Sequence, residues 1–285
     1  MPITLSLSGK VALITGGSRG IGAAAVRMFV AAGARVMFNY EKSKAQSERL
    51  VKELGKKNCA AIHCNLSGTG TAQELVDATI KHFGRLDILV ANHGVWPPED
   101  APIEKMSDAQ WRSTVAINLD SVFALIKHSV AQMKSQKRSG AAAGHIVLVS
   151  STAGQRGEAF HCDYAATKGA LISMVKGLST ELARYAIYVN SVAPGWVDTD
   201  MSATALHNPK TSKAIFSVIP LGRAAKPEEI AAPILFLCTD HAGFITGEVF
   251  NVNGGAVLVG SERKRLYVGP AYISPFFQAS NFLHK

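Results

Sequence analysis

Seven short runs of strongly β-forming residues recur along the chain, and longer stretches of helix-forming residues separate them. Most of these runs are continuously apolar, as in strands that are buried on both faces. The runs are residues 11–15, 34–39, 59–64, 86–91, 145–150, 188–193 and 249–252, with helices expected near 20–32, 43–55, 69–83, 105–136, 162–186 and 226–238. This alternation predicts an α/β fold, a doubly wound parallel seven-stranded sheet with helices on both faces and right-handed crossovers.

Length and composition fit one large domain. The chain has 285 residues, of which 47% are hydrophobic and 18% charged, so it can bury a sizeable core and does not have the composition of a disordered chain. We expect a single domain over residues 1–260. Within it, residues 198–219 should form a lid or substrate loop with a helix near 211–219. Residues 261–285 are a basic and aromatic C-terminal extension.

Several classes of protein are disfavoured by the sequence. No apolar run approaches the length of a membrane span, and the first residues do not read as a signal peptide. The four cysteines form neither a CxxC nor a metal-ligand pattern, so we expect reduced thiols, a cytoplasmic protein and no metal. The net charge of +9 favours anionic substrates or cofactors, but it forms no basic stripe with interleaved aromatic residues, so nucleic acid is not an expected partner.

The stretch TGGSRGIG, residues 15–22, directly follows the first predicted strand and opens the first predicted helix. Its glycines allow a tight turn and let the backbone approach a pyrophosphate, which would rest on the helix N-terminus. The spacing is GxxxGxG rather than GxGxxG. Such a turn can be a plain strand–helix connection, but at this place in an α/β chain it predicts a dinucleotide site.

The end of the second predicted strand should bind the adenosine ribose. An acid there would favour NAD by binding the ribose 2′-hydroxyl, and Tyr40 occupies the expected position. Arg19 and Lys42 could bind a 2′-phosphate, although both could also be solvated surface charges, and Glu41 favours NAD. NADP(H) is therefore the favoured cofactor and NAD(H) the alternative.

The stretch HCDYAATKGA, residues 161–170, places Tyr164 and Lys168 one helical turn apart on the same face. A free tyrosine has a pKa of about 10, which is poorly matched to neutral pH, and a nearby cation would lower it. In isolation such a pair is more often ordinary helix surface than a catalytic pair. The other motifs of the chain decide between these interpretations.

Together with TGGSRGIG and YAATK, the serine motif SSTAG (150–154) makes the sequence resemble the short-chain dehydrogenase/reductase family from about residue 8 to about residue 257. Three further motifs fall in the family order, namely ANHG (91–94), Asn118 and PGWVDTDM (194–201). Within the family, TGGSRGIG and FNVNGG (250–255) are most similar to the 3-oxoacyl-carrier-protein reductase group. The resemblance implies a Rossmann-type fold and NAD(P)-dependent oxidoreductase activity.

The resemblance also implies a catalytic set of Asn118, Ser151, Tyr164 and Lys168. Ser151 would hydrogen-bond to the substrate carbonyl oxygen, and Tyr164 would be the general acid in reduction and the base in oxidation. Lys168 would lower the pKa of Tyr164 and bind the nicotinamide ribose, and Asn118 would hold a water that links Lys168 to solvent. Cofactor contacts are expected from Gly16, Ser18, Arg19, Gly20, Ile21, Gly22, Tyr40, Lys42, Asn65, Leu66, Asn92, Gly94, Tyr164, Lys168, Pro194, Gly195, Val197 and Thr199.

The sequence departs from the family pattern near the site. His93 replaces a small residue and could alter packing beside the cofactor, and Asn65 stands where the family commonly has aspartate. His161 could contact substrate or be a partly exposed structural residue. An apolar substrate wall could be formed by four residues, each of which could equally pack in the core or at an interface: Trp96, Phe160, Trp196 and Met201.

The favoured function is NADP-dependent reduction of a ketone or 3-oxoacyl group to a secondary alcohol. The alternatives are an alcohol, sugar or steroid dehydrogenase that works oxidatively with NAD, and a non-catalytic dinucleotide sensor. An acyl carrier protein is a possible partner through a basic patch near the site that includes Lys137 and Arg138, although Tyr185 stands where a second basic residue is expected. A homotetramer is implied by the resemblance. Residues 261–285 could pack at a subunit interface, cover the substrate site or be a tail that adds nothing to catalysis, and the interface is our hypothesis.

Overall fold

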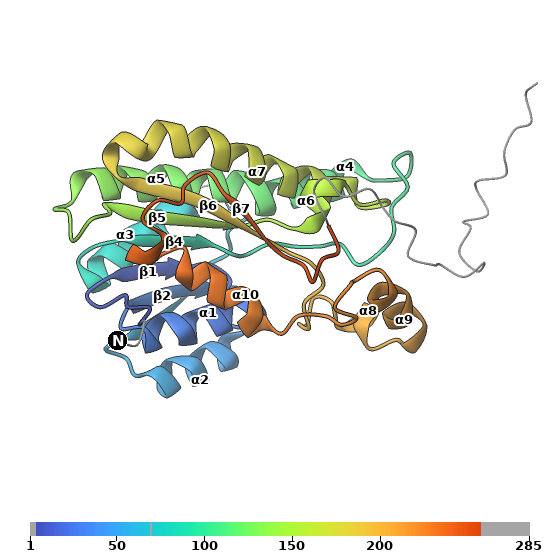
Figure 1. The fold of residues 1–285 in the computed structure, drawn as a ribbon, viewed down its shortest axis with the longest axis horizontal. Helices are drawn as coiled ribbons and strands as arrows, with labels where there is room; N and C mark the ends of the chain where they lie inside the picture. The colour runs from blue at the N-terminus through green and yellow to red at the C-terminus, as the bar shows by residue number, and fades with distance from the viewer. Residues whose placement is uncertain (1–3, 69, 258–285) are drawn as a thin grey trace, which may run out of the picture.

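The computed structural model describes residues 4–68 and 70–257, and it is built around one parallel sheet (Figure 1). The strand order is β3-β2-β1-β4-β5-β6-β7. The fold class predicted from the sequence is therefore confirmed. The strands are β1 (Val11–Ile14), β2 (Arg35–Tyr40), β3 (Cys59–His63), β4 (Ile88–Ala91), β5 (Gly144–Val149), β6 (Ile187–Pro194) and β7 (Val249–Val252).

Helices cover both faces of the sheet (Figure 1). They are α1 (Gly20–Ala31), α2 (Lys44–Leu54), α3 (Thr71–Phe83), α4 (Asp108–Val115), α5 (Ser121–Ser135), α6 (Thr152–Arg156), α7 (Cys162–Leu182), α8 (Ala203–Leu206), α9 (Pro209–Ser217) and α10 (Pro227–Phe236). A π-helical turn, η1 (Ala116–Asp120), joins α4 to α5, and two 3₁₀ turns are η2 (Ala183–Tyr185) and η3 (Asp240–Ala242). One face carries α1, α2 and α10, and the other carries α3, α4, α5 and α7.

The continuous apolar strands reflect this double covering. In β1, Ala12 and Ile14 belong to the core beneath α1 and α10, whereas Val11 and Leu13 belong to the core beneath α3, α5 and α7. All of β1 is buried. Successive side chains of a strand point to opposite faces, so both faces require apolar residues.

Two predicted helical segments differ from the structure. The expected helix over 105–136 begins later, at Asp108, where the Ser107 hydroxyl caps it by accepting from the Gln110 amide at 3.1 Å, and η1 interrupts it. The segment 198–219 holds two helices, so the prediction of a single helix near 211–219 is wrong. Its second helix begins at Pro209, because Asn208 caps it and proline suits the first helical position.

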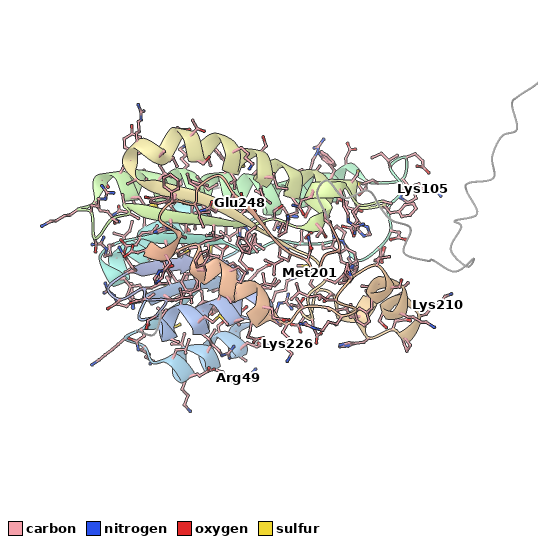
Figure 2. The ribbon with its side chains drawn as sticks, viewed as in Figure 1. Arg49, Lys105, Met201, Lys210, Lys226 and Glu248 are labelled. Atoms are coloured by element: carbon pink, nitrogen blue, oxygen red, sulfur yellow. The ribbon has the colours of Figure 1, made fainter. Side chains whose placement is uncertain are left out.

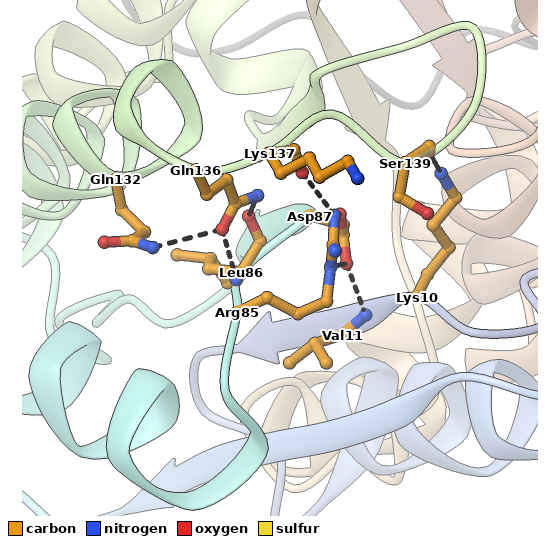
Figure 3. A network of polar contacts seen from close by, with 9 residues as sticks. All are labelled: Lys10, Val11, Arg85, Leu86, Asp87, Gln132, Gln136, Lys137 and Ser139. Carbon is orange, nitrogen blue, oxygen red and sulfur yellow. Dashed lines mark hydrogen bonds and ion pairs between the residues drawn. The ribbon is translucent and has the colours of Figure 1, made fainter.

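A polar network fixes the amino ends of β1 and β4 (Figure 3). The buried Asp87 carboxylate accepts from the Val11 amide at 2.9 Å and from the Arg85 guanidinium at 2.8 and 2.7 Å. Gln136, just after α5, pairs with both backbone groups of Leu86. These contacts satisfy buried backbone groups at the amino edge of the sheet. Ligands of such sheets bind at the opposite, carboxyl edge.

Within the described residues, none of the helices is both long and apolar enough to cross a lipid bilayer. Residues 261–285, for which the hypothesis from the sequence is a place at a subunit interface, lie outside the described part of the chain.

Candidate active site

A cleft of about 440 Å³ opens at the carboxyl edge of the sheet. It lies where the strand order reverses between β1 and β4, which is where doubly wound folds bind ligands. All the predicted site residues except Asn118 line it: Gly16, Ser18, Arg19, Gly20, Ile21, Gly22, Tyr40, Lys42, Asn65, Leu66, Asn92, Gly94, Ser151, Tyr164, Lys168, Pro194, Gly195, Val197 and Thr199. Six strand ends and α7 thus bring together residues that are far apart in the sequence.

The glycine loop between β1 and α1 keeps one end of the cleft bare. Gly16 has a φ of +65°, which favours glycine, and a Cβ on Gly22 would lie 2.1 Å from the Gly16 carbonyl oxygen. No side chain caps the N-terminus of α1, and no acidic residue lies in its first turn. The amide groups and the positive end of the helix dipole are therefore available to an anion.

His93 connects this loop to the opposite side of the cleft. Its Nδ1 lies 2.7 Å from the Thr15 hydroxyl, and its Nε2 lies 2.6 Å from the Ser121 hydroxyl at the start of α5. The Thr15 hydroxyl also accepts from the Asn92 amide at 3.0 Å. Burial lowers the pKa of His93 to about 3, and the Lys168 charge acts in the same direction. His93 is thus a neutral imidazole whose hydrogen bonds hold the glycine loop to the start of α5.

Ser151, Tyr164 and Lys168 meet at the inner end of the cleft. Ser151 follows β5 by two residues and caps α6 by accepting from the Ala153 amide at 3.1 Å. The preceding Ser150 hydroxyl donates to the Lys168 carbonyl at 2.8 Å. The two serines therefore have separate roles. Lys168 is 4% exposed, and its Nζ donates to the Val149 carbonyl at 2.8 Å.

The electrostatics of Tyr164 differ from the prediction. Burial raises the pKa of Tyr164 to about 12, the Ser151 hydroxyl opposes this rise, and the Glu158 charge adds to it. The Lys168 Nζ lies 5.7 Å from the Tyr164 ring centroid, and burial lowers the pKa of Lys168 to about 8. In the protein alone, desolvation therefore outweighs the cation, and the expected lowering of the Tyr164 pKa is wrong for this state.

Asn118 lies behind the cleft wall, in the π-helical turn η1. Its side chain accepts from the Val95 amide at 2.8 Å and donates to the Val95 carbonyl at 2.9 Å and to the Thr167 hydroxyl at 3.3 Å. A Cβ on Gly94 would lie 3.2 Å from the Asn118 Oδ1 and 3.3 Å from the Lys168 Nζ. The Asn118 side chain thus holds the loop after β4 close to Lys168. Its role in holding a water stays a prediction.

The part of the cleft beside the end of β2 carries the residues predicted to select between NADP and NAD. Tyr40 ends β2, Glu41 and Lys42 follow it, and all three line the cleft. Arg19 forms an ion pair with Asp200 at 3.2 Å, and both side chains are exposed. An exposed pair of this kind contributes little free energy, so Arg19 can exchange Asp200 for another anion.

Some residues near the glycine loop were not recognised from the sequence. Asn39 is a buried polar residue at the end of apolar β2; its side chain accepts from the Gly16 amide at 2.9 Å and donates to the Cys64 carbonyl at 3.0 Å. A polar residue within an apolar strand was the available signal. Asn65 turns the chain after β3, since its Oδ1 accepts from the Ser67 amide at 2.9 Å.

The substrate end is formed by loops after β4, β5 and β6. Trp96, Trp196 and Met201 line it, but Phe160 does not: it is 51% exposed and has a φ of +66°. The proposed place of Phe160 in the wall is therefore wrong. Figure 2 shows Met201 between the sheet and the α8–α9 segment. His161, which the sequence left open between a substrate contact and a partly exposed residue, is buried.

Lys137 and Arg138 do not lie near the cleft. They precede β5 at the amino edge of the sheet, where the Lys137 carbonyl accepts from Arg85 (Figure 3). On this chain they cannot form a docking patch beside its own active site, because the cleft opens at the opposite edge. Among the described residues, no group of three or more His, Cys, Asp or Glu side chains is arranged to hold a metal ion.

Comparisons with known proteins show the family of this chain. A family model described as enoyl-(acyl carrier protein) reductase matches residues 16–257. The 3-oxoacyl-[acyl-carrier-protein] reductase FabG of Thermotoga maritima is 37% identical over 89% of this chain and 100% of its own length, and the corresponding Synechocystis reductase is 35% identical over 89% and 99%.

Solved structures show the same relationship. A short-chain dehydrogenase/reductase from Brucella melitensis, titled glucose/ribitol dehydrogenase, is 34% identical with a TM-score of 0.81, over 90% of this chain and 100% of that one. A blue fluorescent protein from a metagenomic library, solved in complex with NADPH, is 32% identical with a TM-score of 0.80, over 89% and 100%. The chain belongs to the short-chain dehydrogenase/reductase family and is an oxidoreductase that acts on C=O and CH–OH groups.

Proposed function

We propose that this protein uses NADPH to reduce a ketone or 3-oxoacyl group to a secondary alcohol. The observation that carries the proposal is that Ser151, Tyr164 and Lys168 line the same cleft as the bare glycine loop. A nicotinamide dinucleotide reaches from a pyrophosphate site at such a loop to its reacting ring.

The residues present fit a nicotinamide dinucleotide. The amides of the glycine loop and the N-terminus of α1 would hold its pyrophosphate, and Asn65 and Leu66 would border its adenine. Lys168 would hold the nicotinamide ribose, and Thr199 would contact the carboxamide. When bound, the cofactor supplies a hydride to the carbonyl carbon, and the protein's own groups manage the oxygen.

Tyr164 is suited to donate a proton in the reducing direction. Because its pKa is about 12 in the protein alone, its hydroxyl is protonated at neutral pH. The Ser151 hydroxyl lies beside it and would donate to the same carbonyl oxygen, stabilising the charge that develops there. The same groups in the opposite protonation states would serve oxidation, so the preference for reduction is supported by the relatives that are named as reductases.

NADP(H) is supported over NAD(H) by the ribose end of the cleft. Tyr40 stands where an acid would bind a 2′-hydroxyl, and Lys42 lines the same place. Arg19 can leave its exposed pairing with Asp200 for a 2′-phosphate. The NADPH complex of a relative of 32% identity adds to this support, while Glu41 is the feature that favours NAD.

The substrate class rests on the relatives. Those with the name 3-oxoacyl-[acyl-carrier-protein] reductase support a 3-oxoacyl thioester, and an acyl carrier protein as its possible bearer. The family model is described by enoyl reduction, which acts on C=C rather than C=O. Two hydroxyls beside each other at Ser151 and Tyr164 suit a carbonyl oxygen better than a C=C bond.

The test is the initial rate of NADPH and NADH oxidation with three substrates: a short 3-oxoacyl thioester, the matching 2-enoyl thioester and an aryl ketone. We expect NADPH oxidation with the thioester ketone or the aryl ketone and none with the enoyl thioester. Replacing Arg19 and Lys42 by Ala should weaken NADPH binding about 10-fold or more and leave NADH binding nearly unchanged. Faster oxidation of NADH by the wild type would overturn the NADP assignment.

A dinucleotide sensor remains the contrasting function. It would bind NADPH but turn over none of the three substrates.

We also propose a cytoplasmic homotetramer. The four cysteines are free thiols, as a reducing compartment requires. Trp111 on α4 and Phe123 on α5 are 42% and 59% exposed, which suits pairing of these helices between subunits. Measurement of the mass in solution tests the assembly, and a monomer would contradict it.

A further inference from the structure

The substrate end of the cleft contains an acidic side chain for which the reduction itself has no use. Glu158 lies in the loop between α6 and α7 and lines the cleft together with Trp96, Tyr164 and Trp196. Its charge reaches the Tyr164 hydroxyl, since it contributes to the raised pKa of that group. The carboxylate is therefore close to the place where the reacting carbonyl would bind.

The position of Glu158 is fixed by Trp96. The Trp96 Nε1 donates to the Glu158 Oε1 at 3.3 Å. His161 stacks on Trp96 with ring centroids 4.7 Å apart and an interplanar angle of 17°. A backbone hydrogen bond of 3.0 Å from the Ala101 amide to the Phe160 carbonyl ties the same two loops together. Trp96 thus holds one carboxylate oxygen, and no hydrogen bond from the described residues reaches the other.

No cation neutralises this carboxylate by direct contact within residues 4–68 and 70–257, because none of their ion pairs includes Glu158. Burial has the largest effect on Glu158 and raises its pKa. The charges of His161 and Arg156 lower the pKa, and the charge of Asp100 raises it. A partly desolvated carboxylate without a paired cation gains from a ligand that brings one.

Two indoles stand beside the carboxylate. Trp96 and Trp196 meet edge to face, with centroids 6.2 Å apart and an interplanar angle of 79°. His161 stacks on one face of Trp96, and both indoles line the cleft. Aromatic rings next to a carboxylate attract alkylammonium groups, because the ring faces have a negative electrostatic potential and the carboxylate has a negative charge.

We propose that Glu158, together with Trp96 and Trp196, selects ketones that carry a positively charged alkylammonium group. This inference rests on the proposed ketone reduction and adds a substrate class to it. The ammonium group would bind between the indoles and the free oxygen of Glu158, and the carbonyl would reach Ser151 and Tyr164. Ketones with a negative charge at the same place would be disfavoured.

The test compares two aryl ketones of one shape, 4-(trimethylammoniomethyl)acetophenone and its neutral isostere 4-neopentylacetophenone. The measured quantity is the ratio of kcat/KM for the cation to kcat/KM for the isostere. The intrinsic reactivity of each ketone is the same with every variant, so changes in this ratio report the protein. In Glu158→Gln the amide oxygen can still accept from Trp96, and only the charge is lost.

We expect Glu158→Gln to lower this ratio roughly 5- to 20-fold. Arg156→Gln removes a nearby positive charge that would repel the ammonium group. It should therefore raise the ratio, a change opposite in sign to that of Glu158→Gln. Glu181→Gln makes the same substitution at an exposed position near the far end of α7, and should leave the ratio unchanged. An unchanged ratio in Glu158→Gln would overturn the proposal and reduce Glu158 to an anchor for Trp96.

Binding distinguishes failure of this inference from failure of the proposed function. Benzyltrimethylammonium carries the cation but no ketone. Its binding to the protein in the presence of NADPH can be measured by calorimetry. We expect binding that Glu158→Gln weakens by the same roughly 5- to 20-fold, even if neither ketone is turned over. Absence of binding to the wild type, or equal binding to Glu158→Gln, would contradict the cation site.

Discussion

Replacing His93 by Ala should remove an acid sensitivity that this half-buried imidazole gives to the folded protein. His93 sits between the hydroxyls of Thr15 and Ser121, at 2.7 and 2.6 Å, and burial lowers its pKa to about 3. In the unfolded chain a histidine has a pKa of about 6.5. Because the folded pKa is the lower one, the unfolded state binds more protons between these values. Stability is therefore full above about pH 6.5 and falls as the pH drops toward 3.

The size of the effect follows from the two pKa values. At pH 4.5 the unfolded histidine is almost fully protonated and the folded one almost fully neutral, which costs about 2.7 kcal/mol. At pH 7 the same difference is only about 0.2 kcal/mol. The wild type should thus lose about 2.5 kcal/mol through His93 between pH 7 and pH 4.5. His145, whose pKa burial lowers to about 4, acts in the same direction but is common to wild type and variant.

The assay is urea unfolding at both pH values and at one protein concentration, since assembly would make stability depend on concentration. His93→Ala will also be less stable at pH 7, because two hydroxyls lose a partner, so the compared quantity is the loss between the two pH values. His82→Ala, at an exposed position of α3, is the control and should keep the acid sensitivity of the wild type. If His93→Ala loses as much stability on acidification as the wild type, the reasoning is wrong.

Gly22→Ala should weaken NADPH binding at least 10-fold and destabilise the protein by about 2 kcal/mol, because the new Cβ would lie 2.1 Å from the Gly16 carbonyl oxygen. The matched change Gly177→Ala, where nothing within 4 Å meets the Cβ, should stabilise α7 by up to about 1 kcal/mol in a thermal unfolding assay. Asp87→Ala should cost about 3 kcal/mol, since it leaves the Arg85 guanidinium without its buried carboxylate, and kcat/KM should change little because this network lies at the amino edge. Equal stability of Asp87→Ala and wild type in urea would refute that account.

The central strands were predictable because both their faces are buried, and β1 differed from its prediction by one residue. The run 249–252 also matched the observed strand β7, although it contains Asn251 and is only partly buried. The segment 198–219 was less predictable, because the four-residue α8 is too short for a periodic pattern. The start of α9 did carry a signal, an asparagine followed by proline, which went unrecognised.

The residues of the cleft could be predicted from motifs, but their electrostatics could not. The prediction for Tyr164 considered the charge of Lys168 and not the burial of both groups, and burial has the larger effect. The role of His93 depends on Thr15 and Ser121, which are 78 and 28 residues away in sequence. Phe160 resembled a wall residue, but its backbone conformation turns it to solvent. Such outcomes depend on tertiary contacts that spacing along the chain does not encode.

The most direct test of the central claim compares the wild type with Tyr164→Phe, which removes one hydroxyl from a side chain that lines the cleft. The measurement pairs the rate of NADPH oxidation with a ketone substrate and the Kd for NADPH of the same preparations. We predict that the variant loses about 10²- to 10⁴-fold in kcat, the usual contribution of a positioned general acid, while its Kd for NADPH changes by less than about 3-fold. Retention of wild-type turnover by Tyr164→Phe would contradict the assignment of Tyr164 as the proton donor.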